Sequence, residues 1–176
     1  SDDARLAARL TDVGPADTVV DVGCGPGVAA RHAARLGATV VGVDPAPVML
    51  RVARLPRRRG DIGYLEGTAE SLPVPDGAAS VLWSLSTVHH WADLAAGLAE
   101  VRRVLKAGAP FLVLFSNRMF PTKAVRVWQS LYDGQRAKLI EAYFHAAGGY
   151  AEPVFTDASP QTGITDPLYA VCARKL

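Results

Sequence analysis

The sequence contains only two cysteines in 176 residues, Cys24 and Cys172. Neither belongs to a CxxC motif or a Cys/His cluster, so the pattern excludes a zinc signature and a disulfide framework. We therefore expect no metal site and a reduced, cytoplasmic setting. Long apolar runs are also lacking: none approaches the roughly 20 residues that a membrane span needs, and the N-terminal residues show no signal-peptide core. These absences predict a soluble protein with no membrane partner.

Aromatic residues are few, 7% of the chain, and the formal net charge is only +2. Basic residues do cluster locally, at Arg51, Arg54, Arg57, Arg58 and Arg59. No aromatic side chain is interleaved there for base stacking, so a solvated helix end and loop is favoured over a nucleic-acid interface. We expect no nucleic-acid partner, and a monomer or homodimer.

Hydrophobic residues make up 49% of the chain, enough for one globular domain over residues 1–176 with a full core. Short β-branched or apolar runs predict buried strands. These runs lie at 18–22, 39–44, 62–67, 80–86 and 110–115. Helical patterns occur at 2–10, 28–37, 47–54 and 93–105. Strands that alternate with helices predict right-handed βαβ units and a mainly parallel sheet.

The pattern changes after residue 115. We expect a helix around Val125–Leu131 and a further amphipathic helix that ends at Gly148 and Gly149. The apolar face of the second helix carries Leu139, Ile140, Tyr143 and Phe144. Two short strands, near 153–156 and 168–173, end the chain. No linker or internal repeat divides the sequence, so one domain is expected.

The stretch D-V-G-C-G-P-G at 21–27 follows the first strand and precedes a helix, as nucleotide-binding loops do. No Lys-Ser/Thr pair follows it, which excludes a Walker loop. The dinucleotide pattern G-x-G-x-x-G/A fits Gly23 and Gly25, but its third position is Val28. Asp21, two residues before the first glycine, is also foreign to that pattern. An NAD-dependent dehydrogenase therefore remains a disfavoured alternative.

This loop resembles motif I of the class I S-adenosylmethionine-dependent methyltransferases. The resemblance continues through V-V-G-V-D, which ends at Asp44, through 66–91 (EGTAESLPVPDGAASVLWSLSTVHHW) and through 98–114 (LAEVRRVLKAGAPFLVL). The sequence is most similar to the small-molecule branch, the methyltransferase type 11 group. The resemblance implies an α/β, doubly wound, mainly parallel seven-stranded sheet with a C-terminal antiparallel strand, a Rossmann-like methyltransferase fold. It implies S-adenosylmethionine as cofactor and S-adenosylhomocysteine as product.

Several residues are expected at the cofactor. Glycines permit close backbone approach to the amino-acid tail, and an acid at position 21 can balance the ammonium group or only brace the loop. The residues expected around the tail are Asp21, Gly23, Gly25, Gly27, Ser84 and Leu85. Asp44 can accept hydrogen bonds from both ribose hydroxyls, or can serve as a turn acid before Pro45.

The resemblance implies an acid after the third strand that meets the adenine amino group, but this sequence has Thr68 at that position. The adenine contact is therefore expected from the backbone of Ala69 or from Glu70. Pro45 and Leu72 can supply apolar walls for the ring.

His89, the first residue of a His-His doublet after the fourth strand, is the candidate general base. Ligands of doubly wound sheets lie at such C-terminal strand edges. Alternatively, His89 or His90 caps the next helix or packs against Trp91. Some relatives pair this His with an acid after the fifth strand, but Ser116 and Asn117 stand there, so no His–acid pair is implied.

Residues 116–134 form the expected acceptor-side insertion. Arg118, Lys123 and Arg126 could attract an acidic acceptor there, whereas Met119, Phe120 and Trp128 could line an apolar pocket or belong to the core. The sequence thus predicts S-adenosylmethionine-dependent methyl transfer to a small-molecule acceptor, most plausibly at oxygen. The alternative from another class is a cofactor-binding protein without turnover.

Overall fold

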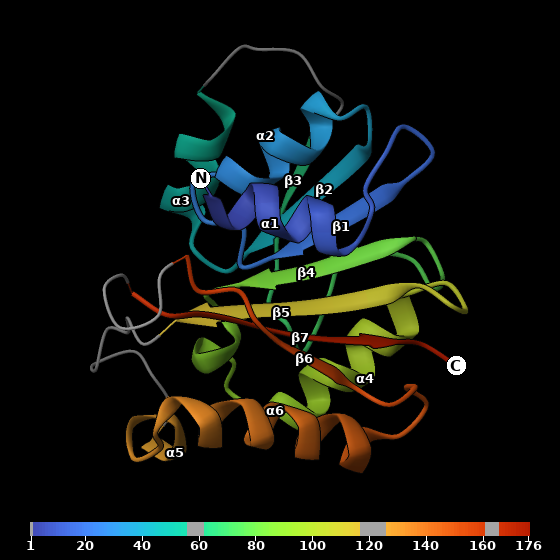
Figure 1. Cartoon of the computed structure of the whole chain (residues 1–176). Coiled ribbons are helices and arrows are strands. Elements are labelled where there is room, and N and C mark those ends of the chain that lie inside the picture. The colour runs from blue at the N-terminus through green and yellow to red at the C-terminus, as the bar shows by residue number, and fades with distance from the viewer. Residues whose placement is uncertain (1, 56–61, 117–125, 161–165) are drawn as a thin grey trace.

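The chain folds around one seven-stranded sheet of strand order β3-β2-β1-β4-β5-β7-β6 (Figure 1). The computed structural model describes residues 2–55, 62–116, 126–160 and 166–176. The strands are β1 (Thr18–Val22), β2 (Thr39–Asp44), β3 (Ile62–Glu66), β4 (Val81–Leu85), β5 (Pro110–Ser116), β6 (Val154–Asp157) and β7 (Leu168–Arg174). Strands β1 to β5 pair in parallel, and β7 runs antiparallel to both β5 and β6. The predicted fold class is confirmed.

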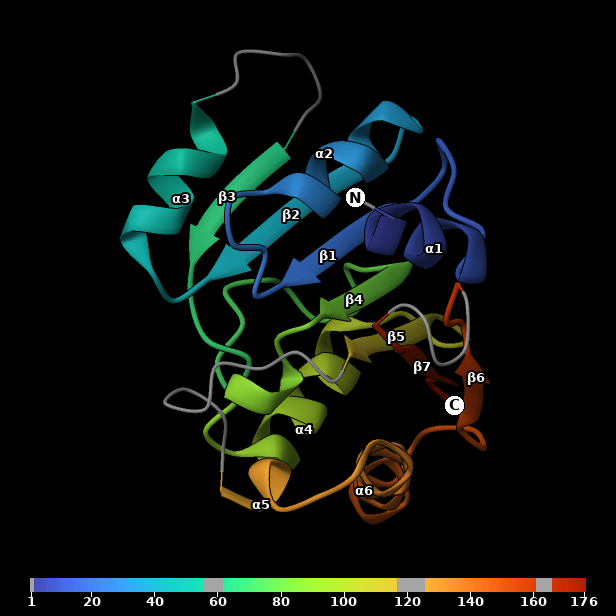
Figure 2. The same cartoon turned by 60° about the vertical axis from the view of Figure 1, so that its left-hand side comes forward.

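Helices cover both faces of this sheet. Figures 1 and 2 show α1, α2 and α3 on one face and α4, α5 and α6 on the other. The helices are α1 (Asp2–Leu10), α2 (Val28–Arg35), α3 (Pro47–Arg54), α4 (Leu94–Val104), α5 (Arg126–Gln129) and α6 (Asp133–Ala147), with a short 3₁₀ helix, η1 (Val88–His90). Among the described residues, no helix is long and apolar enough to cross a membrane.

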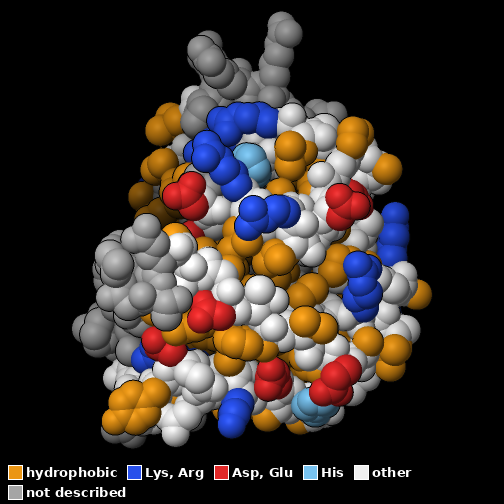
Figure 3. All heavy atoms as spheres, in the orientation of Figure 1, with side chains coloured by type: hydrophobic (Ala, Val, Ile, Leu, Met, Phe, Trp, Pro, Cys, Tyr) orange, Lys and Arg blue, Asp and Glu red, His pale blue; other side chains and the backbone are white. Residues whose placement is uncertain are grey.

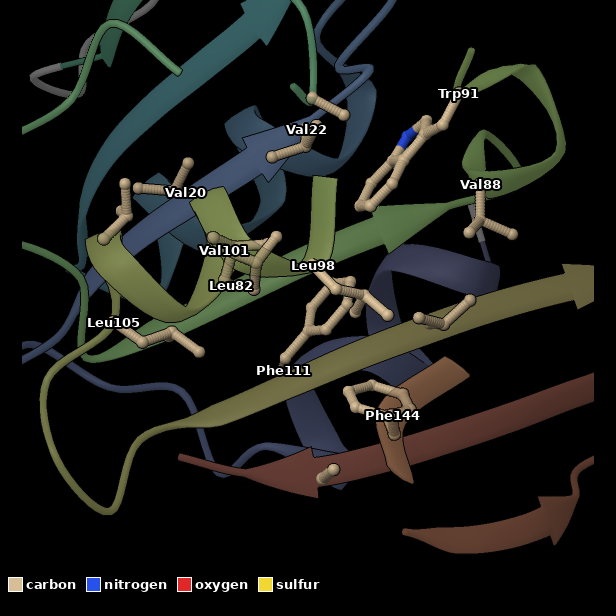
Figure 4. Close-up of a cluster of buried hydrophobic side chains, with 14 of the residues drawn as sticks. Val20, Val22, Leu82, Val88, Trp91, Leu98, Val101, Leu105, Phe111 and Phe144 are labelled. Atoms are coloured by element: carbon tan, nitrogen blue, oxygen red, sulfur yellow. The ribbon is translucent and has the colours of Figure 1, made fainter. Parts of the chain in front are cut away.

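Both faces of the central strands are buried, which is why these strands read as continuous apolar runs rather than as alternating ones. In β4, Val81 and Trp83 belong to the apolar cluster beneath α1 and α2, and Leu82 belongs to the opposite cluster. Figure 4 shows this second cluster, where Leu98 of α4 and Phe144 of α6 gather about Phe111 of β5. Burial of this kind fixes the register of the central strands β1, β4 and β5.

The strand order reverses between β1 and β4, which are direct neighbours although β1 is followed in sequence by β2. Ligands of open α/β sheets bind outside the carboxyl ends of the strands at such a switch point, because the connecting helices leave there in opposite directions. The glycine loop after β1 and the His-His doublet after β4 both lie at this edge. The fold therefore brings the predicted cofactor loop and the predicted base to one place.

Candidate cofactor-binding and active site

A pocket of about 190 Å³ lies beside the loop between β1 and α2. Its lining comprises Asp3, Asp21, Gly23, Cys24, Gly25, Pro26, Val28, Ala29 and Leu85. Four of the predicted site residues thus meet here: Asp21, Gly23, Gly25 and Leu85. The other expected cofactor residues, Gly27, Asp44, Pro45, Thr68, Ala69, Glu70 and Ser84, do not line this pocket. Asp3, in the first turn of α1, was not predicted, and no motif in the sequence marks it.

Gly23 and Gly25 have left-handed backbone conformations, with φ of +74° and +50°. A Cβ on Gly23 would lie 2.6–2.7 Å from side-chain atoms of Thr87, so this glycine is required by packing. A Cβ on Gly25, in contrast, would meet no atom within 4 Å of the described structure. The space beside Gly25 is open and belongs to the pocket wall, which suits a ligand that approaches the backbone closely.

Asp21 is only 2% exposed, and its Oδ2 atom has no hydrogen-bond partner among the described residues. Burial is the main cause that raises the pKa of its carboxyl to about 7; a backbone hydrogen bond from Ala30 opposes this rise, and the charge of Asp44 adds a smaller increase. A buried carboxyl oxygen without a partner is costly unless a ligand satisfies it. The cationic ammonium group of S-adenosylmethionine fits this donor-poor, negatively polarised position.

Asp44 ends β2 and is 7% exposed. Its Oδ2 accepts a hydrogen bond from the Gly25 backbone N–H at 2.9 Å, and its Oδ1 accepts one from the Ala46 N–H at 2.9 Å. Asp44 therefore acts as the turn acid before Pro45, one of the two roles expected from the sequence, and it also holds the glycine loop in place. Each carboxylate oxygen has a second lone pair, so this bracing leaves acceptor capacity for a ribose diol.

The loop expected at the adenine ring lies between β3 and β4. Thr68 is exposed, Ala69 is buried, and the Oε1 atom of Glu70 accepts a hydrogen bond from the Asp93 N–H at 3.0 Å. Pro45 is exposed and Leu72 is buried, so only Pro45 presents a free apolar surface in this state. Because one Glu70 oxygen is engaged, the Ala69 backbone is the simpler adenine partner.

This loop is held by two charged residues of α4 that sequence reasoning did not assign. Arg103 donates to the carbonyls of Leu72 at 3.0 Å and Val74 at 2.9 Å, and it forms an ion pair with Glu100. Glu100 Oε2 accepts a hydrogen bond from the Leu72 N–H at 2.9 Å. The R-V-L-K segment that contains Arg103 was part of the family resemblance, and its structural role explains why an arginine is useful there.

The end of β4 contributes a second set of unpredicted contacts. Ser84 is fully buried, with its hydroxyl 2.9 Å from that of Thr87, which in turn donates to the Val22 carbonyl at 3.0 Å. Only the backbone of Ser84 is therefore suited to a cofactor contact. Ser86 has a φ of +58°, a strained conformation for a residue with a side chain, at the edge where ligands are expected.

His89 lies in η1 and is 4% exposed, whereas His90 is exposed, although the two rings lie close together with centroids 4.0 Å apart. Neither His caps the next helix, because the Asp93 side chain accepts the Ala96 N–H at 3.0 Å. The His89 ring stacks on Trp128, with centroids 5.6 Å apart. Burial, with smaller contributions from the charges of His90 and Arg136, lowers the pKa of His89 to about 4. Its imidazole is therefore neutral at pH 7.

Trp128 of α5 is 2% exposed and is held from several sides. The Arg136 guanidinium carbon lies 5.5 Å from its ring centroid, and Arg136 Nε donates to the Trp128 carbonyl at 3.2 Å. Arg136 is itself buried and is paired with Asp133 at 3.0 Å. Phe115 meets the indole edge-on, with centroids 5.3 Å apart. Trp128 was expected either in an apolar acceptor pocket or in the core, and these contacts place it in the packed interior.

Most of the other candidate acceptor residues in the insertion lie in a segment that the structure does not describe. Arg118, Met119, Phe120 and Lys123, together with Asn117, lie outside the described residues, as does the side chain of Arg126.

Within the described ranges, no group of three or more His, Cys, Asp or Glu side chains is positioned to hold a metal ion. Figure 3 shows the face covered by α1 and α2, where several basic side chains gather over the helices with carboxylates on either side. Burial, with smaller contributions from the charges of Arg35 and Arg5, lowers the pKa of His32, so these two arginines lie near that ring. A mixed surface of this kind differs from the continuous basic stripe of a nucleic-acid-binding face.

Comparison with known proteins places this geometry in a family. The family described as "Methyltransferase domain" matches residues 20–113, more than half of the chain. The chain is 39% identical to the malonyl-[acyl-carrier protein] O-methyltransferase of Serratia marcescens over 64% of its own length and 44% of that protein. It is 32% identical to the ubiquinone biosynthesis O-methyltransferase of Methylobacterium sp. over 62% of its length and 45% of the relative. The chain thus spans less than half the length of these curated relatives.

The solved structure of an S-adenosylmethionine-dependent methyltransferase from Mesorhizobium loti has the same fold, with a TM-score of 0.72 over 97% of this chain and 96% of that one, at 20% identity. Because the sequence identity is low, this likeness bears on the fold alone. The family match includes the glycine loop, Asp44, the His-His doublet and the R-V-L-K segment. The chain belongs to the S-adenosylmethionine-dependent methyltransferase domain family.

Proposed function

We propose that this chain binds S-adenosylmethionine at the glycine loop and transfers its methyl group to an oxygen atom of a small-molecule acceptor. The observation that carries the proposal is the buried Asp21 carboxyl, whose Oδ2 lacks a partner among the described residues beside an open pocket. A pyrophosphate would be repelled by an acid at this position, whereas an ammonium group would be attracted. The O-methyltransferase names of the two sequence relatives support oxygen as the methylated atom.

The remaining cofactor contacts follow from the same edge of the sheet. Asp44 receives the ribose hydroxyls on its free lone pairs, while Gly25 leaves the backbone accessible to the amino-acid tail; the space beside Gly27 is instead filled by the side chain of Tyr64. Pro45 and the backbone of Ala69 border the adenine, and the Ser84 backbone and Leu85 meet the methionine chain. When bound, S-adenosylmethionine supplies a methyl group already activated by the positive sulfonium. The protein therefore has to orient the acceptor and remove its proton.

His89 performs the proton removal in this proposal. Its imidazole is neutral and able to accept a proton at pH 7, because burial lowers its pKa to about 4. A base with so low a pKa is weak, so it acts on an oxygen whose acidity rises as the bond to methyl forms. The lack of an acidic partner for His89 among the described residues is the one observation that favours the alternative, a cofactor-binding protein without turnover.

Calorimetric titration with S-adenosylhomocysteine and with NAD tests the cofactor assignment. We expect clear binding of S-adenosylhomocysteine and none of NAD, and the opposite result would refute the proposal. Asp44→Ala should weaken S-adenosylhomocysteine binding by at least about tenfold, since a charge-assisted hydrogen bond contributes about 1.5–3 kcal/mol. Glu152→Ala, which removes an exposed acid in the segment between α6 and β6, away from the glycine loop and the adenine loop, is the matched control.

A further inference from the structure

Two neighbouring buried rings each carry a nitrogen that has no hydrogen-bond partner among the described residues. The Nδ1 of His89 and the Nε1 of Trp128 have no hydrogen-bond partner among the described residues, and the side chains are 4% and 2% exposed. The two rings stack with an interplanar angle of 24° and centroids 5.6 Å apart. Native proteins rarely bury such atoms unsatisfied, and a pair of them on touching rings points to a missing ligand group.

The chemistry of the two atoms restricts what that group can be. An indole N–H only donates, whereas one nitrogen of a neutral imidazole only accepts. The base role proposed for His89 requires Nδ1 to be the unprotonated nitrogen, so a group that satisfies both atoms accepts one hydrogen bond and donates another. A hydroxyl does this with one oxygen atom and retains a second lone pair for attack on a methyl group. A neutral amine nitrogen has a single lone pair, so it cannot accept from the indole and attack at the same time.

Building on the proposed function, we propose that Trp128 is a second acceptor-binding residue. One hydroxyl oxygen of the acceptor donates to His89 Nδ1 and accepts from Trp128 Nε1, so the acceptor class is a phenol or enol, which keeps its O–H proton at pH 7. In the transfer, the O–H proton moves to Nδ1 and its electron pair stays on oxygen. An electron pair on this oxygen forms the new O–CH₃ bond as the C–S bond breaks. The electron pair of the C–S bond stays on the sulfur of S-adenosylhomocysteine.

Trp128 is built to hold this position. The Arg136 guanidinium lies over the indole ring of Trp128, donates to the Trp128 carbonyl and forms an ion pair with Asp133. These contacts tie α5 to the first turn of α6. The same guanidinium places positive charge near the two rings, which stabilises negative charge as it develops on the acceptor oxygen. The indole N–H is a fixed donor toward that charge. Because both nitrogens are buried in this state, the acceptor reaches them only as neighbouring side chains move apart.

The test compares phenol with anisole, which differ by the hydroxyl proton. Each is titrated by calorimetry into wild-type protein saturated with S-adenosylhomocysteine. We expect phenol to bind at least about tenfold more tightly, since anisole leaves Nδ1 unsatisfied. Trp128→Phe keeps an aromatic ring against His89 but removes the N–H, and it should weaken phenol binding by a similar factor. Trp91→Phe is the matched control, because it removes an indole from the core beside Phe111 and should leave phenol binding unchanged.

Turnover gives a second readout. With a phenolic acceptor, Trp128→Phe should lower kcat/KM at least about tenfold while the affinity for S-adenosylhomocysteine stays at the wild-type value. Phenol that binds no better than anisole, no measurable binding of either, an unchanged Trp128→Phe variant, or transfer to amines alone would each overturn the inference and leave the cofactor site standing. The wild-type comparison needs no variant, so a Trp128→Phe chain that fails to fold does not remove the test. Loss of S-adenosylhomocysteine binding in the wild type would instead overturn the proposed function and this inference together.

Discussion

Binding of S-adenosylhomocysteine is expected to release a proton from Asp21. The free protein holds this buried carboxyl with a pKa of about 7, so it is about 90% protonated at pH 6 and about half protonated at pH 7. The ligand's ammonium group pairs with the charged form only. Binding should therefore release about 0.9 proton at pH 6 and about 0.5 at pH 7, and the affinity should rise about fivefold over that interval.

The assay is calorimetry at both pH values in two buffers with different heats of ionisation, from which the number of released protons follows. Asp21→Asn preserves shape but cannot ionise, so its binding should be weaker and independent of pH. A second control is 5′-methylthioadenosine, which lacks the amino-acid tail and should release no proton. Equal release with both ligands, or release that persists in Asp21→Asn, would show that Asp21 does not meet the ammonium group.

Three other substitutions give distinct outcomes. Gly23→Ala should destabilise the protein by about 1–3 kcal/mol in urea unfolding, because its Cβ would collide with Thr87 at a φ of +74°. Gly25→Ala should cost only about 1 kcal/mol, since nothing described lies within 4 Å of the new Cβ, but it should impair S-adenosylhomocysteine binding; equal effects of both on binding and stability would contradict this. The neutral, buried His89 contributes a loss of up to about 3 kcal/mol as the pH falls from 6.5 to 4, because the unfolded chain takes up the proton first, whereas the raised pKa of Asp21 opposes this loss. The difference in unfolding free energy between wild type and His89→Phe isolates the His89 contribution, and a difference that does not change between pH 6.5 and pH 4 would reject it.

The positions of the strands along the chain were predictable because each central strand is a short apolar run bounded by turn residues. The five parallel strands begin and end within one residue of the expected positions. The α2 helix ends at Arg35 rather than at Gly37, because Gly37 takes a φ of +95° beyond the helix end. The buried Arg136 was not foreseen, since a charged residue on the apolar face of α6 is explained only by its long-range contact with Trp128.

The candidate site was only partly predictable for the same reason. Asp21, Gly23 and Gly25 belong to one short motif, so their proximity follows from local sequence, and Leu85 joins them through the adjacent strand. The stack of His89 on Trp128 joins η1, which follows β4, to α5, which follows β5, and no local pattern specifies it. Asp3 reaches the pocket through the packing of α1 against the sheet. Tertiary contacts of this kind leave no periodic signal in the sequence.

Transfer of a labelled methyl group tests the central claim most directly. The protein is incubated with S-adenosylmethionine carrying a trideuterated methyl group and a panel of phenols, enols, carboxylic acids and amines, and the products are analysed by mass spectrometry. We predict that S-adenosylhomocysteine forms together with a product that carries the label on oxygen, and that His89→Ala lowers the rate. Tight binding of S-adenosylhomocysteine without transfer to any oxygen acceptor, or label found only on nitrogen or carbon, would contradict the account.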